Sequence, residues 1–127
     1  MIVLQGRVKT GIGDFSKRMK QIPGLLDAYF KKTGMHFVPG TLNVQLKETY
    51  SLPKDKIIRL EGVEYGGTVS VNIVPCKING KKAFILRTDK NEAGKGDHPK
   101  TIIEIACSVM LREKFHLKDD DEVTISV

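Results

Sequence analysis

The chain has 127 residues, 40% of them hydrophobic and 28% charged, with a formal net charge of +6. This composition is ordinary for one soluble globular domain with a buried core. No apolar run approaches the roughly 20 residues that span a membrane. The first five residues lack the basic start and the apolar core of a signal peptide. Because Cys76 and Cys107 lack CxxC spacing and stand in apolar surroundings, we expect buried free thiols in a cytoplasmic protein.

The positive charge is concentrated in the first third of the chain, where few acidic residues oppose it. Such an excess favours an anionic partner, namely a nucleotide, a phosphorylated metabolite or a nucleic acid, although solubility alone explains a charge of this size equally well. Nucleic acid is the weakest of these partners, since phenylalanine and tyrosine do not alternate with lysine and arginine as stacking platforms require. The early basic residues are Arg7, Lys9, Lys17, Arg18, Lys20, Lys31 and Lys32.

The first elements in chain order are a strand and a glycine-containing loop. Ile2 to Val8 reads as the strand, and Thr10 to Ser16 follows with Gly11 and Gly13. Two glycines let backbone N–H groups approach a phosphate closely. The loop lacks the spacing of a Walker loop or of a dinucleotide fingerprint, so an ordinary connection is the alternative.

A helix is expected over Pro23 to Gly34. Proline suits its first turn, the basic pair near its end complements the helix dipole, and Gly34 suits the position after it. Leu25, Leu26, Tyr29 and Phe30 form an apolar stripe at helical spacing, which predicts a core face.

The stretch after Pro39-Gly40 carries the first candidate for a metal site. Residues 41–46 alternate like a half-buried strand that begins directly after the turn. Thr41 and Asn43 then face the same side, opposite to the leucines and the valine between them. A hydroxyl and an amide oxygen suit a hard cation such as Mg²⁺, which completes its shell with water and phosphate oxygens. The alternative is two polar residues on an exposed strand face.

Three more strands are expected over residues 56–60, 68–78 and 82–87. Pro75 falls inside the second of them, which predicts an edge or a bulge at that point. Asn79-Gly80 is a strong two-residue hairpin turn between the second and the third.

The stretch from Thr88 to Lys100 is polar and long enough to be a mobile lid or a disordered insertion, and we expect His98 within it to be exposed. Residues 101–107 follow as an apolar strand interrupted by Glu104. If Glu104 is buried, its carboxylate needs a partner, because burying a charge alone is costly. The alternative is that Glu104 faces the edge of the sheet.

The remaining elements are a short helix over residues 108–115, with Ser108 as its N-cap, and a strand over residues 122–127. These strands, with two inserted helices and no βαβ rhythm, favour a small closed barrel over a doubly wound sheet. We therefore expect a mainly β fold that forms one domain over residues 1–127.

Three stretches give the chain a resemblance to a known family. Pro39 to Val44, Ile102 to Ile105 and Leu111 to Asp121 are similar, in order and context, to motifs of the archaeal-type CTP-dependent riboflavin kinases. The resemblance covers nearly the whole chain. It implies a six-stranded cradle-loop barrel that transfers the terminal phosphoryl group of CTP to riboflavin, giving FMN and CDP. It also implies that the protein binds these small molecules, and we expect a monomer.

The resemblance assigns roles residue by residue. Thr41 and Asn43 would hold Mg²⁺, while Thr88 and Glu104 would contact the flavin. Two segments would bind the nucleotide, the second at the cytosine. The residues of these segments are Gly11, Ile12, Gly13, Asp14, Phe15 and Ser16, and then Val109, Met110, Leu111 and Arg112.

Three departures from the family pattern leave an alternative open. One of the family's three loop glycines is missing, since the loop has only Gly11 and Gly13 before Phe15, and the alignment can shift by two residues, so which glycine is missing stays open. The stretch from Thr88 to Lys100 is longer than the family's, and Cys107-Ser108 replaces Ala-Pro. A non-catalytic nucleotide- or flavin-binding homologue on the same barrel fits these departures, because a fold does not imply a function.

Overall fold

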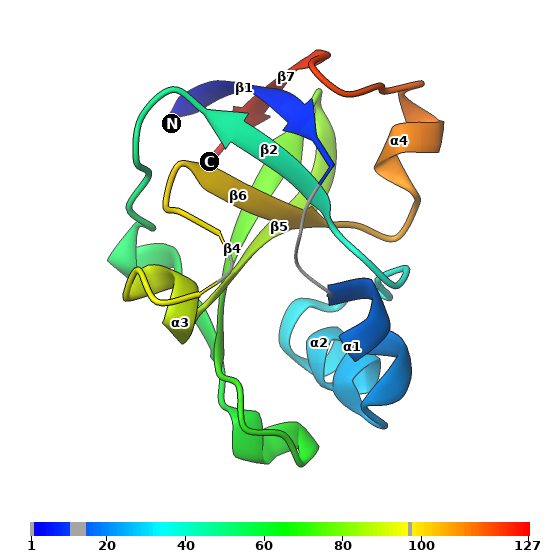
Figure 1. Ribbon diagram of the computed structural model, residues 1–127. Helices are drawn as coiled ribbons and strands as arrows, with labels where there is room; N and C mark the ends of the chain where they lie inside the picture. Colours follow the sequence, from blue (N-terminus) through cyan, green and yellow to red (C-terminus); the bar gives the residue numbers. More distant parts are fainter. Residues whose placement is uncertain (1, 11–14, 97) are drawn as a thin grey trace.

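The computed structural model describes residues 2–10, 15–96 and 98–127, and within them seven strands form one sheet (Figure 1). The strands follow the order β3-β4-β5-β6-β2-β1-β7, every pair is antiparallel, and β4 also pairs with β7. This last pairing closes six strands into a barrel and leaves β3 outside on β4. The expected mainly β, closed six-stranded barrel is confirmed. The strands are β1 (Val3–Lys9), β2 (Leu42–Leu46), β3 (Ile58–Leu60), β4 (Val71–Ile78), β5 (Lys81–Thr88), β6 (Ile102–Ala106) and β7 (Glu122–Ser126).

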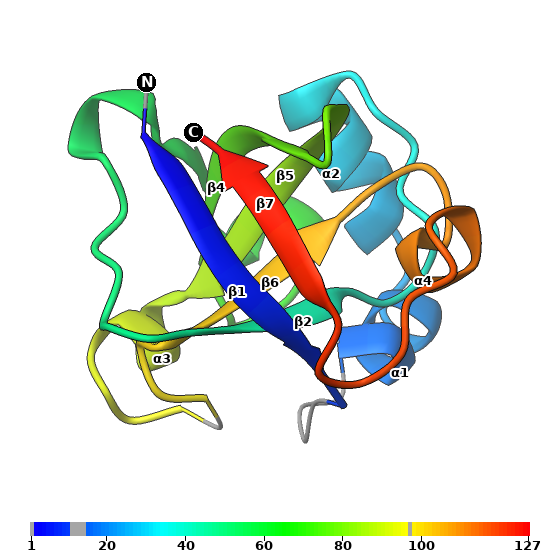
Figure 2. The same cartoon turned by 90° about the horizontal axis from the view of Figure 1, so that it is seen from above.

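Short helices lie outside the barrel wall. They are α1 (Phe15–Gln21), α2 (Leu25–Thr33), α3 (Asp89–Glu92) and α4 (Leu111–Lys114), with 3₁₀ turns at Lys54–Lys56 and Gly62–Tyr65. Figure 2 shows α1 and α2 together on one side of the barrel and α4 close to the start of β2.

Two hydrophobic clusters hold the fold together. The first fills the barrel, and alternate residues of β2 and β6 such as Val44 and Ile105 supply it. The second lies on the outer face of the wall, where Leu25 and Tyr29 of α2 pack against Phe84 and Leu86 of β5. Because successive strand residues face opposite sides, β5 is buried on both faces. On the outer face of the barrel wall, α1 and α2 therefore shield the strand side chains from solvent.

Pro75 sits at a gap in the sheet, as expected. It lies opposite Phe84 of β5, but on its other side the pairing with β3 ends at Ile73 and the pairing with β7 begins at Lys77. The missing proline N–H therefore costs no ladder hydrogen bond, which confirms the predicted edge position.

Several predicted boundaries are wrong. The helix α1 was not expected, and it forms because Met19 is buried in the outer cluster. The next helix begins at Leu25 rather than Pro23, since Gly24 is left-handed at φ 83°, while Gly34 ends it as predicted by donating to the Phe30 carbonyl. The strand β4 starts at Val71 rather than residue 68.

Two predictions in the C-terminal half are corrected as well. The stretch from Thr88 to Lys100 contains the helical turn α3 rather than being wholly irregular. The last helix covers only Leu111–Lys114, and its N-cap is Met110 instead of Ser108.

We predict that Gly6→Ala lowers the free energy of unfolding by about 2 kcal/mol, because the site has no room for a methyl group. A Cβ at Gly6 would stand 2.5 Å from Val44 Cγ1 and 2.7 Å from the Gln45 carbonyl oxygen. Urea unfolding measures the change. The neighbouring exposed residue provides the control, since Gln5→Ala is expected to change stability by less than about 0.5 kcal/mol. Equal stability of Gly6→Ala and wild type would contradict this packing.

Candidate functional site

A cavity of about 240 Å³ opens beside β2 and β6. It is lined by residues 38–43, by Glu104 and Ile105 of β6, and by residues 107 and 109–112, which lead into α4. The cavity thus brings together Thr41, Asn43, Glu104 and the segment from Val109 to Arg112, although these were predicted from three separate stretches of sequence.

The strand register explains why Asn43 and Glu104 meet. The two residues are directly opposite each other in the β2–β6 pair. Their neighbours Val44 and Ile105 point into the barrel, so Asn43 and Glu104 point to its outer side. Thr41 stands just ahead of β2, and its hydroxyl donates a hydrogen bond to Glu104 Oε1 at 3.1 Å. The turn at Gly40, with φ 109°, sets the start of this arrangement.

The side chain of Asn43 offers an unused acceptor. Its Oδ1 atom is buried and has no hydrogen-bond partner among the residues that the structure describes. Buried polar atoms are rarely left unsatisfied in native proteins, because the lost hydration is costly. A cation or a donor supplied by a ligand would satisfy this oxygen.

Glu104 is buried, with 4% of its surface exposed, and it has partners as the sequence required. Besides Thr41, the His98 Nε2 atom lies 3.8 Å from Glu104 Oε1. His98 is itself only 5% exposed, so the expectation of an exposed histidine is wrong. The burial results from a tertiary contact. The backbone N–H of His98 donates to Asn91 Oδ1 at 3.3 Å, which ties this segment to α3. The imidazole lies beside Glu104 of β6.

Tyr29, which is not among the residues lining the cavity, carries a buried hydroxyl that the sequence did not single out. Its side chain is fully buried in the outer cluster, and its hydroxyl has no hydrogen-bond partner within the described part of the chain. Burial first, and then the charges of Tyr65 and Glu104, raise its pKa well above the usual range. The helical stripe predicted a core position for Tyr29, which is correct, but no local pattern indicated that its hydroxyl is buried without a hydrogen-bond partner among the described residues.

Thr88 lies apart from the residues that line this cavity. It is the last residue of β5, it is 6% exposed, and its hydroxyl accepts a hydrogen bond from the Asn91 N–H at the start of α3. Its contact with a flavin stays a prediction. Of the other predicted nucleotide contacts, Gly11 to Asp14 lie outside the described residues, and the backbone of Phe15 and Ser16 begins α1.

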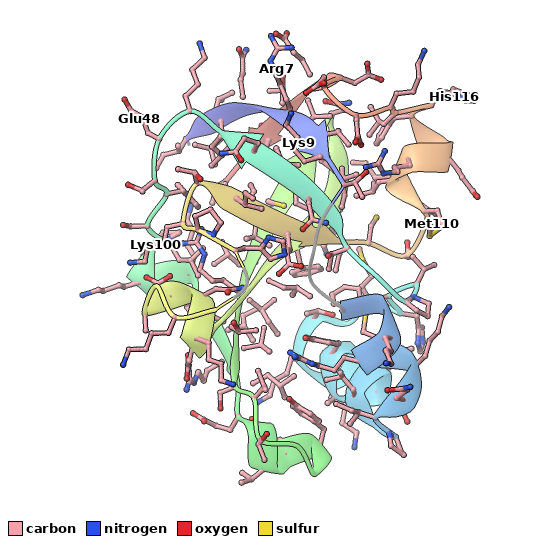
Figure 3. The ribbon with its side chains drawn as sticks, viewed as in Figure 1. Arg7, Lys9, Glu48, Lys100, Met110 and His116 are labelled. Carbon is pink, nitrogen blue, oxygen red and sulfur yellow. The ribbon has the colours of Figure 1, made fainter. Side chains whose placement is uncertain are left out.

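The opposite wall of the cavity comes from the segment before α4 and its first residues. Met110 is 48% exposed at the cavity rim (Figure 3), while Leu111 is buried in the barrel cluster. The Arg112 guanidinium donates to Asp119 Oδ1 at 2.8 Å. This hydrogen bond, followed by one from Thr10, holds the pKa of Asp119 below its usual range, so its carboxylate is charged at neutral pH.

Both cysteines are buried free thiols, as predicted. Burial raises the pKa of Cys76 to about 12, with a smaller contribution from Cys107. The Cys76 thiol is therefore protonated and unreactive at neutral pH. Across the described ranges, no group of three or more His, Cys, Asp or Glu residues could hold a metal ion, and no helix is long and apolar enough to cross a membrane.

The chain is thus a closed antiparallel barrel with a partly polar cavity beside β2 and β6. The particular family follows from sequence comparison. The family model CTP-dep_RFKase, described as "Domain of unknown function DUF120", matches residues 8–127. The chain therefore belongs to this family, and the resemblance read from its motifs is confirmed.

Curated relatives carry the name riboflavin kinase. The one from Methanocella arvoryzae is 30% identical over 98% of this chain and 56% of its own length. The one from Methanosarcina acetivorans is 30% identical over 100% of this chain and 54% of its own length. The chain thus spans little more than half of these two relatives. A third, from Sulfurisphaera tokodaii, is 31% identical over 98% of this chain and 93% of its own length.

Proposed function

We propose that this protein is a riboflavin kinase that transfers the terminal phosphoryl group of CTP to riboflavin with Mg²⁺, giving FMN and CDP. The observation that carries the proposal is the convergence of Thr41, Asn43 and Glu104 on one cavity wall in a chain of this family. The Sulfurisphaera relative supports it, because the barrel alone corresponds to 93% of a protein named riboflavin kinase.

The residues at the head of β2 fit a magnesium ion. Thr41 Oγ1 and the buried, unsatisfied Asn43 Oδ1 are hard oxygen donors on adjoining positions of the cavity. The ion needs no all-protein cage, because Mg²⁺ normally keeps several waters and binds substrate phosphates. When bound, it would neutralise charge on the phosphates of CTP.

The protein's own residues would then position the two substrates. We propose that Glu104 accepts a hydrogen bond from the flavin or its ribityl chain, while Thr41 links this carboxylate to the metal side of the cavity. Thr88 would contact the flavin from the end of β5. Phosphoryl transfer asks mainly for such positioning, since an aligned donor and acceptor remove much of the entropic barrier.

The nucleotide would lie between two segments. Residues 11–16 would bind the phosphates, and Val109 to Arg112 would contact the cytosine from the opposite wall of the cavity. Selection of CTP over ATP would come from hydrogen bonds to the pyrimidine edge, because a site built for one base leaves polar groups unpaired with another.

Incubation with riboflavin, Mg²⁺ and either CTP or ATP, followed by chromatographic separation of FMN, tests the proposal. We expect FMN and CDP to appear in equal amounts with CTP, and much less FMN with ATP. Omission of riboflavin provides the control for simple CTP hydrolysis. Binding of CDP or FMN without any turnover would overturn the kinase proposal in favour of a non-catalytic binder.

A further inference from the structure

One carboxylate connects the cavity wall with the end of β1. The Thr10 hydroxyl donates a bifurcated hydrogen bond to the Asp119 carboxylate, at 2.9 Å to Oδ2 and 3.1 Å to Oδ1. The same Oδ1 accepts from Arg112 Nη2 at 2.8 Å. Arg112 lines the cavity from α4, and Thr10 directly follows β1. Asp119 therefore holds together two segments that are about a hundred positions apart in the chain.

The loop that carries Asp119 is itself fixed to β1. The Asp120 N–H donates to the Val8 carbonyl at 2.7 Å, and the Val8 N–H donates to the Asp121 carbonyl at 2.9 Å. Figure 2 shows this connection between α4 and β7 passing the end of β1. Asp120 adopts a left-handed conformation with φ 74°, which is uncommon outside glycine. The backbone thus places the Asp119 side chain between its two partners.

Charge on this surface is balanced around the loop. Lys9 pairs with Asp120, and Arg7 pairs with Glu122 at 3.3 Å. Asp119 itself is matched by Arg112. An unpaired carboxylate beside the cavity would repel an anionic ligand, and the pairing with Arg112 reduces this repulsion.

We propose that Asp119 is a positioning residue for the nucleotide, which fixes the Arg112 side chain at the cavity and the Thr10 end of β1 in one arrangement. This inference rests on the proposed function, because it assumes that Arg112, which lines the cavity, contacts CTP there. A free arginine side chain loses much rotamer freedom when it is ordered. A partner that orders it before the ligand arrives removes that cost from binding.

Asp119→Asn tests the proposal, since it removes the charge and keeps the shape. We expect the Kd for CDP, measured by calorimetry, and the KM for CTP to rise about fivefold, as contacting residues commonly couple by this amount. The KM for riboflavin and the Tm should stay unchanged, because exposed ion pairs contribute little to stability. A merely structural role would lower the Tm and leave the nucleotide KM alone. Asp119→Glu should restore part of the affinity.

Glu122→Gln is the matched control, because it removes another carboxylate of the same surface, paired with Arg7, and should leave CDP binding unchanged. A double-mutant cycle sharpens the test. Thr10→Val and Arg112→Gln should affect CDP binding non-additively in the wild type and additively in the Asp119→Asn background. If the wild type binds CDP and Asp119→Asn binds it equally well, the inference is overturned. If the wild type binds no CDP, the proposed function fails, and the inference fails with it.

Discussion

Replacing Asn43 with alanine is expected to lower kcat for FMN formation by at least about 100-fold while leaving the barrel folded. A positioned group that stabilises developing charge is commonly worth this much. The Asn43 Oδ1 atom is buried at the cavity and has no partner among the described residues, so its loss costs the fold little. Steady-state kinetics and a thermal melt on the same preparation measure both effects.

Gln45→Ala is the matched control for this substitution. Gln45 lies two residues further along β2 on the same face, but its amide donates to the Leu46 carbonyl at 2.9 Å and it does not line the cavity. We expect its kcat to stay within about twofold of wild type, because it contacts neither substrate nor metal in the proposed site. Full activity of Asn43→Ala, or an equal loss in both variants, would contradict a metal-binding role for Asn43.

Arg87→Met is expected to lower the free energy of unfolding by about 3 kcal/mol, the largest stability effect we predict. Arg87 is 3% exposed, and its guanidinium donates to the Tyr50 carbonyl, to the Lys100 carbonyl at 3.3 Å and to Glu92 at 3.2 Å. Methionine leaves all three acceptors without this donor. Because Arg87 precedes Thr88 and holds Glu92 and Lys100 of the segment that follows, the KM for riboflavin should rise as well.

Arg59 provides the comparison, since it makes as many contacts from an exposed position. It pairs with Glu61 at 2.8 Å and with Asp89 at 2.5 Å, and Asp89 followed by Glu61 raises its pKa above the usual range. Solvent screens such pairs, so Arg59→Met should cost less than about 1 kcal/mol. If urea unfolding gave the same loss of unfolding free energy for Arg87→Met and Arg59→Met, burial of the arginine would not determine the size of the destabilisation.

The parts of the site that follow from short-range patterns could be predicted from the sequence. A turn followed by strict alternation places Thr41 and Asn43 on the same face of β2, whatever the rest of the chain does. Likewise, a carboxylate inside an apolar strand requires a partner, and Glu104 has one in Thr41. The hairpin at Asn79-Gly80 also follows from local turn chemistry.

The parts that depend on distant contacts could not be predicted in this way. The burial of His98 depends on Asn91 and on the packing of α3 against the end of β5, which no window around the histidine contains. The environment of the Tyr29 hydroxyl depends on which strand lies beneath α2. The helix α1 is too short for propensity to specify it, and it forms because Met19 finds a buried site.

A crystal structure with CDP and Mn²⁺ in place of Mg²⁺ tests the central claim most directly, because anomalous scattering locates the manganese ion. We predict an ion about 2.1 to 2.2 Å from both Thr41 Oγ1 and Asn43 Oδ1, with the CDP phosphates bound to it and the cytosine against residues 109–112. An ion and nucleotide bound away from this cavity, with Asn43 Oδ1 still unsatisfied, would contradict the account.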